Sequence, residues 1–247
     1  MDELGDRMKR YEGAFLSRLP DNLPRVLRID GRCFHSFTRG CEKPFDFNLM
    51  DMMDKVAIAV VKDVSNSRLA YVQSDEISVL ICKKSKEAQF WFNNEVQKMV
   101  SIAAGVASST ATAYAIGGPE VIGHGLLPSF DARVFVLPEY EVPNYFIWRQ
   151  SDWSRNSVQM LARIYYTQKQ LHGKSLEQMH DMLQDVGVNW NDLPTKLKRG
   201  RCIVKKPRNI DGNLEWAVDE NIPIFTEDRS YITKHLTIDE SSAEANI

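Results

Sequence analysis

The strongest constraint on the fold is the order in which strand-like and helix-like segments follow one another. Apolar residues alternate with polar ones in short runs, as in half-buried strands, and recur every three or four positions in two longer runs, as in amphipathic helices. The strand-like runs cover 26–30, 69–73, 77–81 and 131–137, and the helical runs cover 46–64 and 95–115. This βαββαβ order predicts an α+β fold of the ferredoxin-like type, in which the first strand lies beside the hairpin of the second and third.

The composition is that of an ordinary globular protein. Lysines and arginines number 31 against 33 aspartates and glutamates, a formal net charge of -2, so a nucleic-acid surface would have to be local. The 4 cysteines show no C-x-x-C spacing, which argues against a zinc knuckle or a disulfide framework. We find no apolar run near the roughly 18 residues of a membrane helix and no signal-like start, so we expect a cytoplasmic protein without a membrane partner.

Two apolar runs end on a carboxylate. Asp30 closes the first strand-like run, and Asp75 lies at the tip of the predicted hairpin, so the topology brings them together. Carboxylates on adjacent strands can hold two Mg²⁺ ions, an arrangement that serves phosphoryl or nucleotidyl transfer. Asp-Gly and Ser-Asp pairs also end strands simply because they turn well. That alternative explains either pair alone, whereas both pairs in this topology favour a metal site.

Positive charge is concentrated toward the C-terminal end. Residues 196–208 are rich in lysine and arginine and include no acidic residue. The basic residues are Lys196, Lys198, Arg199, Arg201, Lys205, Lys206 and Arg208. A phosphate backbone is the natural partner of such a tract, although solvated runs of charge are commoner in proteins at large. A smaller group, Lys83, Lys84 and Lys86, fits RNA contact and a solvated strand end equally well.

Longer motifs surround these residues. They are RIDGRCFHSF at 28–37, EKPFD at 42–46, SDE at 74–76, FDAR at 130–133, WRQSD at 148–152 and KRG at 198–200. In order and spacing they resemble the motifs of the tRNA-His guanylyltransferase family, along nearly the whole chain up to about residue 238. The resemblance implies a palm-like core of the polymerase and cyclase type, which adds nucleotides to the 5′ end of tRNA in the 3′-to-5′ direction.

The resemblance also implies roles for particular residues. Asp30 and Asp75 would be the catalytic carboxylates and would hold two Mg²⁺ ions, with the carbonyl of Gly31 as a further ligand. The implied nucleotide-binding residues are Asp30, Gly31, Arg32, Cys33, Phe34, His35, Lys43, Ser74, Asp75 and Asn156. The implied supporting residues are Arg28 and Glu76. The implied RNA-binding residues are Arg149, Arg155, Lys198, Arg199 and Arg201.

Substrates, partners and domains follow from the same resemblance. ATP would adenylylate a 5′-monophosphate, the 3′-hydroxyl of an incoming GTP or other nucleoside triphosphate would attack it, and pyrophosphate would later be removed. The partner would be the acceptor stem of tRNA, and the assembly a homotetramer built as a dimer of dimers. We expect a palm-like catalytic domain over 1–138, a mostly helical extension for RNA and nucleotide binding over 139–238, and a disordered acidic tail over 239–247.

A long helix predicted over 145–171 departs from the family pattern. Members dedicated to the extra guanosine of tRNA-His carry His-Ile-Asn-Asn after W-R-Q-x-D, but this chain has Ser-Arg-Asn-Ser at 154–157. The departure is similar to that of the Thg1-like branch, which repairs truncated tRNA 5′ ends against a template. We therefore expect template-dependent repair, with dedicated addition of guanosine at position -1 as the alternative. In the same helix, Trp148 and Trp153 are expected in the core.

Two other functions are compatible with parts of the pattern. A nucleotide cyclase would use the same two carboxylates but would not need the basic residues at 196–208 or the WRQSD helix. A non-catalytic RNA-binding module of the ferredoxin-like type usually exposes aromatic residues on its sheet. Here the corresponding face is predicted to carry Arg28 and Asp30, so both functions are less favoured than nucleotide addition.

Overall fold

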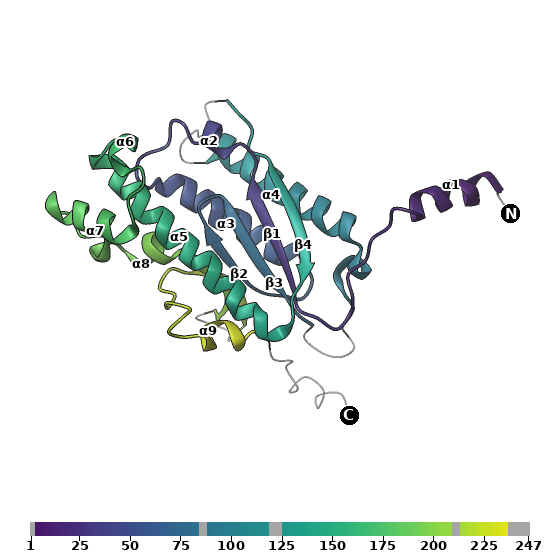
Figure 1. The fold of residues 1–247 in the computed structure, drawn as a ribbon. Helices are drawn as coiled ribbons and strands as arrows, with labels where there is room; N and C mark the ends of the chain where they lie inside the picture. The colour runs from purple at the N-terminus through teal and green to yellow at the C-terminus, as the bar shows by residue number, and fades with distance from the viewer. Residues whose placement is uncertain (1–2, 84–87, 119–124, 209–212, 237–247) are drawn as a thin grey trace.

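The computed structural model describes residues 3–83, 88–118, 125–208 and 213–236. A six-stranded antiparallel sheet runs through them in the order β4-β1-β3-β2-β5-β6, of which Figure 1 labels β4, β1, β3 and β2. The strands are β1 (Arg25–Gly31), β2 (Ser67–Gln73), β3 (Glu76–Ile81), β4 (Phe130–Val136), β5 (Arg201–Pro207) and β6 (Leu214–Asp219). The first four are the predicted strands, and β1 pairs with β3 as expected, so the ferredoxin-like prediction is confirmed.

Helices cover both faces of this sheet. They are α1 (Glu3–Gly13), α2 (Phe34–Phe37), α3 (Phe47–Asp63), α4 (Val96–Gly117), α5 (Val142–Tyr165), α6 (Gln168–Leu171), α7 (Leu176–Asp185), α8 (Thr195–Arg199) and α9 (Ser230–Thr233), with 3-10 turns at Trp91–Asn94, Glu139–Glu141 and Trp190–Asp192. Side chains alternate along β1, so Leu27 and Ile29 pack with α3 and α4, while Val26 packs with α5 on the opposite face. The second face is therefore covered rather than open to RNA.

The start of α3 follows directly from its sequence. Asp46 is the N-cap, and its carboxylate accepts hydrogen bonds from the backbone N–H of Leu49 and of Glu42, both at 2.8 Å. The bond from Leu49 satisfies a donor that the first turn of a helix leaves without a partner, and the bond from Glu42 holds the preceding loop. The predicted cap is confirmed, and it also fixes the loop that carries Lys43.

The prediction of one continuous helix over 145–171 is wrong, because two helices cover this range. α5 ends at Tyr165, and a new short helix begins after Thr167, whose side chain and that of Gln170 form a capping box. This reciprocal cap ends one helix and starts the next. Trp153 is buried as expected, but Trp148 is 53% exposed, because it lies on the side of α5 turned away from the sheet.

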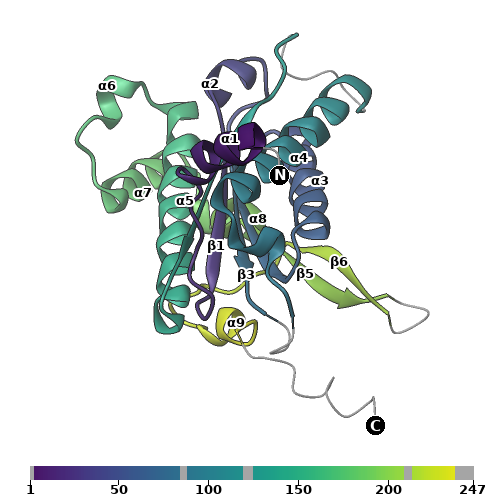
Figure 2. The same ribbon diagram turned by 90° about the vertical axis from the view of Figure 1, so that its right-hand side faces the viewer.

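Two strands, β5 and β6, were not anticipated from the sequence. β5 pairs with the edge of β2, and β6 pairs with β5, so residues beyond 138 complete the same sheet as the predicted catalytic domain. Figure 2 shows these two strands extending from the sheet as a ribbon. The extension is otherwise helical, as expected, while Lys84, Lys86 and the predicted tail at 239–247 lie outside the described residues.

α4 reaches the length and apolar composition of a membrane span, which was not expected from the sequence. It does so through small residues, which raise the hydropathy without forming a long aliphatic run. One face of α4 packs into the core through Ala103, Ala107, Ala111 and Ala115. A single such helix is weak evidence for a membrane, since core helices of globular proteins meet the same criterion.

Candidate active site

The two predicted carboxylates meet at one end of the sheet. Asp30 and Gly31 end β1, and Ser74 and Asp75 form the tight turn between β2 and β3, with Ser74 at a φ of 45°. The backbone N–H of Gly31 donates to the carbonyl of Asp75 at 3.1 Å, which ties the strand end to the turn. We call these four residues the carboxylate turn.

The carboxylate turn holds more negative charge than its surroundings compensate. The pKa of Asp30 is raised from its ordinary value of 3.8 by burial first, and then by the charges of Asp75 and Glu76, while Arg28 opposes the shift. The pKa of Asp75 is also raised, again mainly by burial. Partly buried carboxylates that repel one another favour the binding of a cation.

Gly31 is the residue that this backbone requires. A Cβ atom there would lie 2.3 Å from the ring of Phe34, which is buried against Phe37 and Phe130 at ring-centroid distances of 5.0 Å. The ring anchors the predicted triphosphate loop, so Phe34 contributes packing and can offer only its backbone to a ligand. The N–H of Arg32 donates to the carbonyl of Ser129 at 2.8 Å and is therefore already used. Of the backbone N–H groups predicted to bind the triphosphate at 32–35, those of 33–35 are left for this role.

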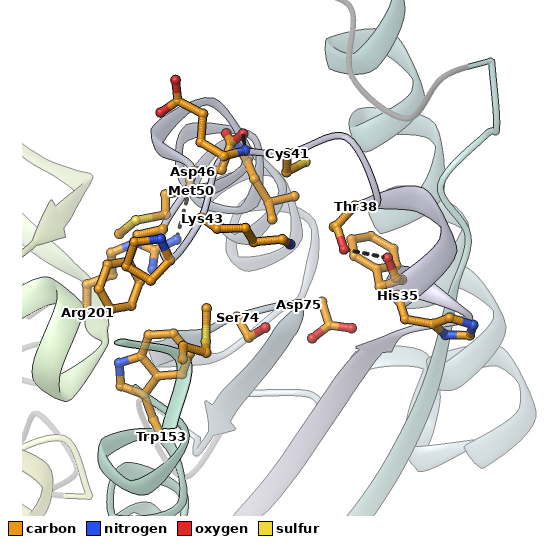
Figure 3. A pocket seen from close by; sticks show the side chains of 16 residues that line it. His35, Thr38, Cys41, Lys43, Asp46, Met50, Ser74, Asp75, Trp153 and Arg201 are labelled. Atoms are coloured by element: carbon orange, nitrogen blue, oxygen red, sulfur yellow. Dashed lines mark hydrogen bonds between the residues drawn. The ribbon is translucent and has the colours of Figure 1, made fainter. Parts of the chain in front are cut away.

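A cavity of about 360 Å³ opens beside the carboxylate turn. Figure 3 shows Lys43 extending into it, with Ser74 and Asp75 on the opposite wall, Trp153 below, and the ring of His35 turned away at the rim. Its remaining lining residues are Phe34, Thr38, Cys41, Glu42, Pro44, Phe45, Asp46, Leu49, Met50, Met160 and Arg201. The cavity thus has a charged end at Lys43 and Asp75 and an apolar end at Trp153 and Met160 of α5, the division that a nucleoside triphosphate requires. Asp30 lies beside this cavity and is not part of its lining.

Glu76 does not join the carboxylate turn. Its carboxylate accepts from Arg149 Nε at 2.8 Å and from Arg149 Nη2 at 2.7 Å, and it also accepts from Gln73 and Ser78 at 3.3 Å. Burial lowers the pKa of Arg149, but the hydrogen bond and charge of Glu76 outweigh this, and the net shift is upward. Glu76 therefore joins β3 to α5, and the supporting role expected of it stays a prediction.

Two of the predicted RNA contacts are wrong. Arg149 and Arg201 are buried, with side chains 8% and 1% exposed, and each is held by a carboxylate, Glu76 and Asp54 respectively. Arg201 also donates to the carbonyl of Met50 at 3.0 Å, and it forms part of the cavity wall. Both side chains hold elements of the fold together and are not on the surface.

The other predicted RNA contacts lie around a second cavity of about 320 Å³ between α5, α7 and α8. Arg155, Lys198 and Arg199 line it together with Trp190. Arg155 forms an ion pair with Asp152, and Lys198 lies over the Trp190 ring at 5.8 Å. The remaining basic residues that can be described are mostly paired across β5 and β6, for example Lys206 with Asp219 at 3.3 Å.

Sequence reasoning missed part of the cavity wall. Trp153 and Met160 were not expected to face a ligand, although their seven-residue spacing places them on one side of α5. The predicted nucleotide ligand Asn156 lies between them and is half-buried, but it does not line the cavity. Arg28 extends from the α5-facing side of β1, where its charge opposes the rise in the pKa of Asp30. The supporting role expected of Arg28 stays a prediction.

The fold and the site together define a protein of the palm class, in which carboxylates from the first strand and the central hairpin meet beside a nucleotide-sized cavity. Residues 5–138 match the Thg1 family model, described as tRNAHis guanylyltransferase. The tRNA(His) guanylyltransferase of Schizosaccharomyces pombe is 32% identical over 225 residues, which cover 85% of this chain and 81% of the relative.

Solved structures agree with this match. A bacterial tRNA(His) guanylyltransferase (Thg1)-like protein in complex with ATP has a TM-score of 0.88 and 39% identity, covering 96% of this chain and 100% of that one. The Saccharomyces cerevisiae tRNA(His) guanylyltransferase, at 22% identity and a TM-score of 0.68, shares the fold over 88% of this chain and 98% of that one. This chain belongs to the tRNAHis guanylyltransferase family, as the sequence motifs indicated.

Proposed function

We propose that this protein is a nucleotidyltransferase that adds nucleotides to the 5′ end of tRNA in the 3′-to-5′ direction and repairs truncated ends against a template. The observation that carries the proposal is the carboxylate turn beside a cavity of about 360 Å³ that also contains Lys43. Family membership and the Thg1-like relatives named as complexes with ATP and with GTP support nucleoside triphosphates as substrates.

The residues at the carboxylate turn fit Mg²⁺. Asp30, Asp75 and the carbonyl of Gly31 offer the hard oxygen donors that Mg²⁺ prefers. Among the described residues no group of three or more His, Cys, Asp or Glu side chains could hold a metal ion, which suits an ion that completes its shell with water and phosphate oxygens. When bound, a pair of Mg²⁺ ions would activate the attacking oxygen and neutralise the leaving phosphate.

The chain's own residues would position the nucleotide. Lys43 would meet the triphosphate as a point charge, and Ser74 would contact it from the opposite wall. The backbone of 33–35 and the rim residue His35 would hold the distal phosphates, while Trp153 would contact the base or sugar. A nucleotide held in this way keeps its reacting phosphorus aligned with the attacking oxygen.

Template-dependent repair is preferred over dedicated addition to tRNA-His because of residues 154–157. Ser154 and Ser157 donate to the carbonyls of Lys198 and Leu197, at 2.9 and 2.7 Å, and so dock α5 against α8. These serines serve the fold and offer no base-reading group. Base pairing with the opposite strand would then select the nucleotide, and the protein would recognise the duplex end by its shape.

Arg155, Lys198 and Arg199 are the basic residues we propose for the RNA backbone, because they share the second cavity. Following the family resemblance, we propose a cytoplasmic homotetramer built as a dimer of dimers. The alternative within the family is dedicated addition of guanosine to tRNA-His, and a cyclase with the same carboxylates is a distant one. An RNA-binding module with an open sheet is disfavoured, because α5 covers that face.

The proposal is tested by nucleotide addition to a 5′-truncated, 5′-monophosphorylated tRNA beside full-length tRNA-His, with ATP, Mg²⁺ and each nucleoside triphosphate in turn. Template-matched addition to the truncated RNA is the expected result. Guanosine addition confined to tRNA-His would instead establish the dedicated activity. Cyclic nucleotide formed from a triphosphate alone would establish a cyclase, and no product with any substrate would overturn all three.

A further inference from the structure

Trp148 presents its indole ring to solvent near the carboxylate turn. All 5 tryptophans of the chain lie among the described residues, and Trp148 alone among them is exposed. A tryptophan side chain is highly buried in most folded proteins. An exposed indole beside a candidate reaction centre is therefore a candidate contact for a substrate, and its surroundings show which substrate it fits.

Contacts on the two sides of α5 show which way Trp148 faces. On one side, Ser154 and Ser157 donate to carbonyls of α8. On the other side, the ring of Tyr145 lies 5.6 Å from that of Phe135 on β4, and the ring of Trp148 lies 5.9 Å from the same tyrosine, edge to face. Trp148 therefore lies on the β4 side of α5. Figure 1 shows β1 and β4 on this side of the helix and α7 and α8 on the other.

Trp148 is also level with Asp30 along the sheet. Its neighbour Arg149 is bonded to Glu76, and Glu76 is the partner of Asp30 in the pairing of β1 with β3. Neither Trp148 nor Asp30 lines the cavity proposed for the nucleoside triphosphate. Nucleotide addition brings two reactants to one metal site, where they must meet in line. With the triphosphate in the cavity, the side of Trp148 and Asp30 is left for the RNA end.

The ring of Trp148 is held in a fixed position. The guanidinium carbon of Arg149 lies over the ring, 4.4 Å from its centroid, and so covers one face. Tyr145 supports the ring edge-on, and its hydroxyl lies 2.8 Å from that of Ser78 on β3. Both supports are thus tied to the sheet, while 53% of Trp148 stays exposed. RNA-binding proteins stack the bases of RNA ends on aromatic side chains held in this way.

We propose that the exposed face of Trp148 stacks on the terminal base at the 5′ end of the RNA and so places the 5′-phosphate at the carboxylate turn. This inference rests on the proposed function, because it names a contact to the RNA substrate. Stacking accepts any base, since every base has a π-face. It therefore suits a site in which pairing with the opposite strand selects the nucleotide.

The first test measures the binding of a hairpin RNA whose stem ends in a base pair with a 5′-monophosphate, without ATP or Mg²⁺. Trp148→Ala should weaken binding by about 10-fold or more, the effect of losing one base stacked on an aromatic side chain. A second RNA has an abasic 5′-terminal nucleotide, which keeps the sugar and the phosphate. It should bind wild-type protein and Trp148→Ala equally, and equal losses with both RNAs would overturn the stacking contact.

Two further variants show whether the effect belongs to the ring. Trp148→Phe keeps an aromatic face and should recover most of the lost affinity. Tyr140→Ala removes an aromatic ring that is 75% exposed in the turn before α5, and it should bind both RNAs as the wild type does. Urea unfolding and light scattering establish the fold and the mass of each variant. A change of mass in Trp148→Ala would overturn the proposal, because it would place the ring between copies of the chain.

The second test separates the RNA from the triphosphate in the kinetics of nucleotide addition. Trp148→Ala should raise the KM for RNA about 10-fold, by the same loss of stacking. It should leave the KM for the nucleoside triphosphate unchanged, because the cavity that holds it does not include this ring. A raised KM for the triphosphate with an unchanged KM for RNA would show that Trp148 stacks on the incoming nucleotide, and would overturn its assignment to the RNA.

Failure of this inference and failure of the proposed function give different results. If the wild-type protein adds no nucleotide to any RNA, the proposed reaction is wrong, while the binding test still shows whether Trp148 contacts the RNA end. If the wild type adds nucleotides and Trp148→Ala equals it in affinity and in both KM values, only the stacking contact is wrong.

Discussion

The carboxylate turn and the basic tract at 196–208 are two charged regions of one sheet. They differ in whether a side chain of opposite charge is bonded to their charged groups. Asp30 and Asp75 are brought together without a basic residue bonded to either carboxylate among the described residues, and their pKa values are raised. In the basic tract, Arg201 is buried with Asp54, and Lys206 pairs with Asp219. Charge without a partner at the carboxylate turn predicts a bound ligand. Charge that is paired in the basic tract mostly predicts a role in holding the fold together.

The sharpest test of this comparison removes one carboxylate of the turn. Asp30→Asn or Asp75→Asn should lower nucleotide addition about 10³-fold or more, because a bound metal supplies several kcal/mol of stabilisation to the transition state. The measurement is the single-turnover rate with the truncated tRNA. Asp131→Asn is the matched control, since Asp131 faces Asp30 on β4 but has a side chain 56% exposed, and it should lose less than about tenfold. Equal losses in all variants would contradict the assignment.

A compensated charge should behave differently. Arg149→Ala would leave Glu76 buried without its partner and should lower the free energy of unfolding by about 3–5 kcal/mol. The combination of Arg149→Met with Glu76→Gln should restore most of that loss, since neither charge remains. Urea unfolding measures both variants. Arg155→Ala, at an exposed ion pair, is the control and should change stability by less than about 1 kcal/mol.

Lys43 tests whether the cavity is the triphosphate site. Lys43→Ala should lower kcat/KM for the nucleoside triphosphate by about 10- to 100-fold, because a hydrogen bond to a charged group contributes roughly 1.5–3 kcal/mol. Lys55→Ala removes a lysine from the exposed side of α3 and should leave the kinetics unchanged. A loss confined to RNA binding would place Lys43 outside the triphosphate site.

Within the basic tract, neighbouring residues are expected to differ in whether they bind RNA. Lys198→Ala and Arg199→Ala should each reduce the slope of log affinity for RNA against log salt by about 0.9 for every duplex phosphate that the side chain neutralises. Arg201→Ala should leave that slope unchanged and lower the stability of the fold, because its guanidinium is buried with Asp54. Binding titrations from low to high salt measure the slope. Identical slopes in all three variants would remove this surface from the RNA interface.

The smallest expected effect concerns stability without metal. Because the pKa of Asp30 is raised in the fold, its contribution to stability is complete below the ordinary value of 3.8 and is lost as the pH rises through the raised pKa. At pH 7 without Mg²⁺ the ionised Asp30 therefore destabilises the fold, and Asp30→Asn should raise the Tm there. The gain should disappear near pH 3, and a lowered Tm at pH 7 would contradict the shift.

The parts of the fold that sequence patterns predicted are those set by local chemistry. The alternation in 26–30 fixes which side chains face α3 and α4, and Asp46 caps α3 because a carboxylate in that position satisfies the first N–H groups. Gly31 is required because the ring of Phe34 occupies the place of a Cβ. The pairing of Asp30 with the hairpin followed from the βαββαβ order alone.

The parts that were missed depend on contacts between residues far apart in the chain. β5 carries three basic residues before its terminal proline, and only its pairing with β2 and β6 shows that it is a strand. Arg149 and Arg201 look like surface charges in the sequence, because the acidic partners that bury them come from distant elements. Trp153 resembles any core residue until the loop at 41–46 closes the cavity over it.

The sequence by itself determined the order of elements, the position of both carboxylates, the loop that follows Gly31 and the family to which the chain belongs, because periodicity, turn chemistry and motif spacing are local properties. The tertiary structure decided which charges are compensated, where the cavity opens, and which apolar side chains stay exposed among the described residues. The physical reason is that the energy of a charge or of an apolar side chain depends on what surrounds it. Those surroundings come from segments that only the folded chain brings together.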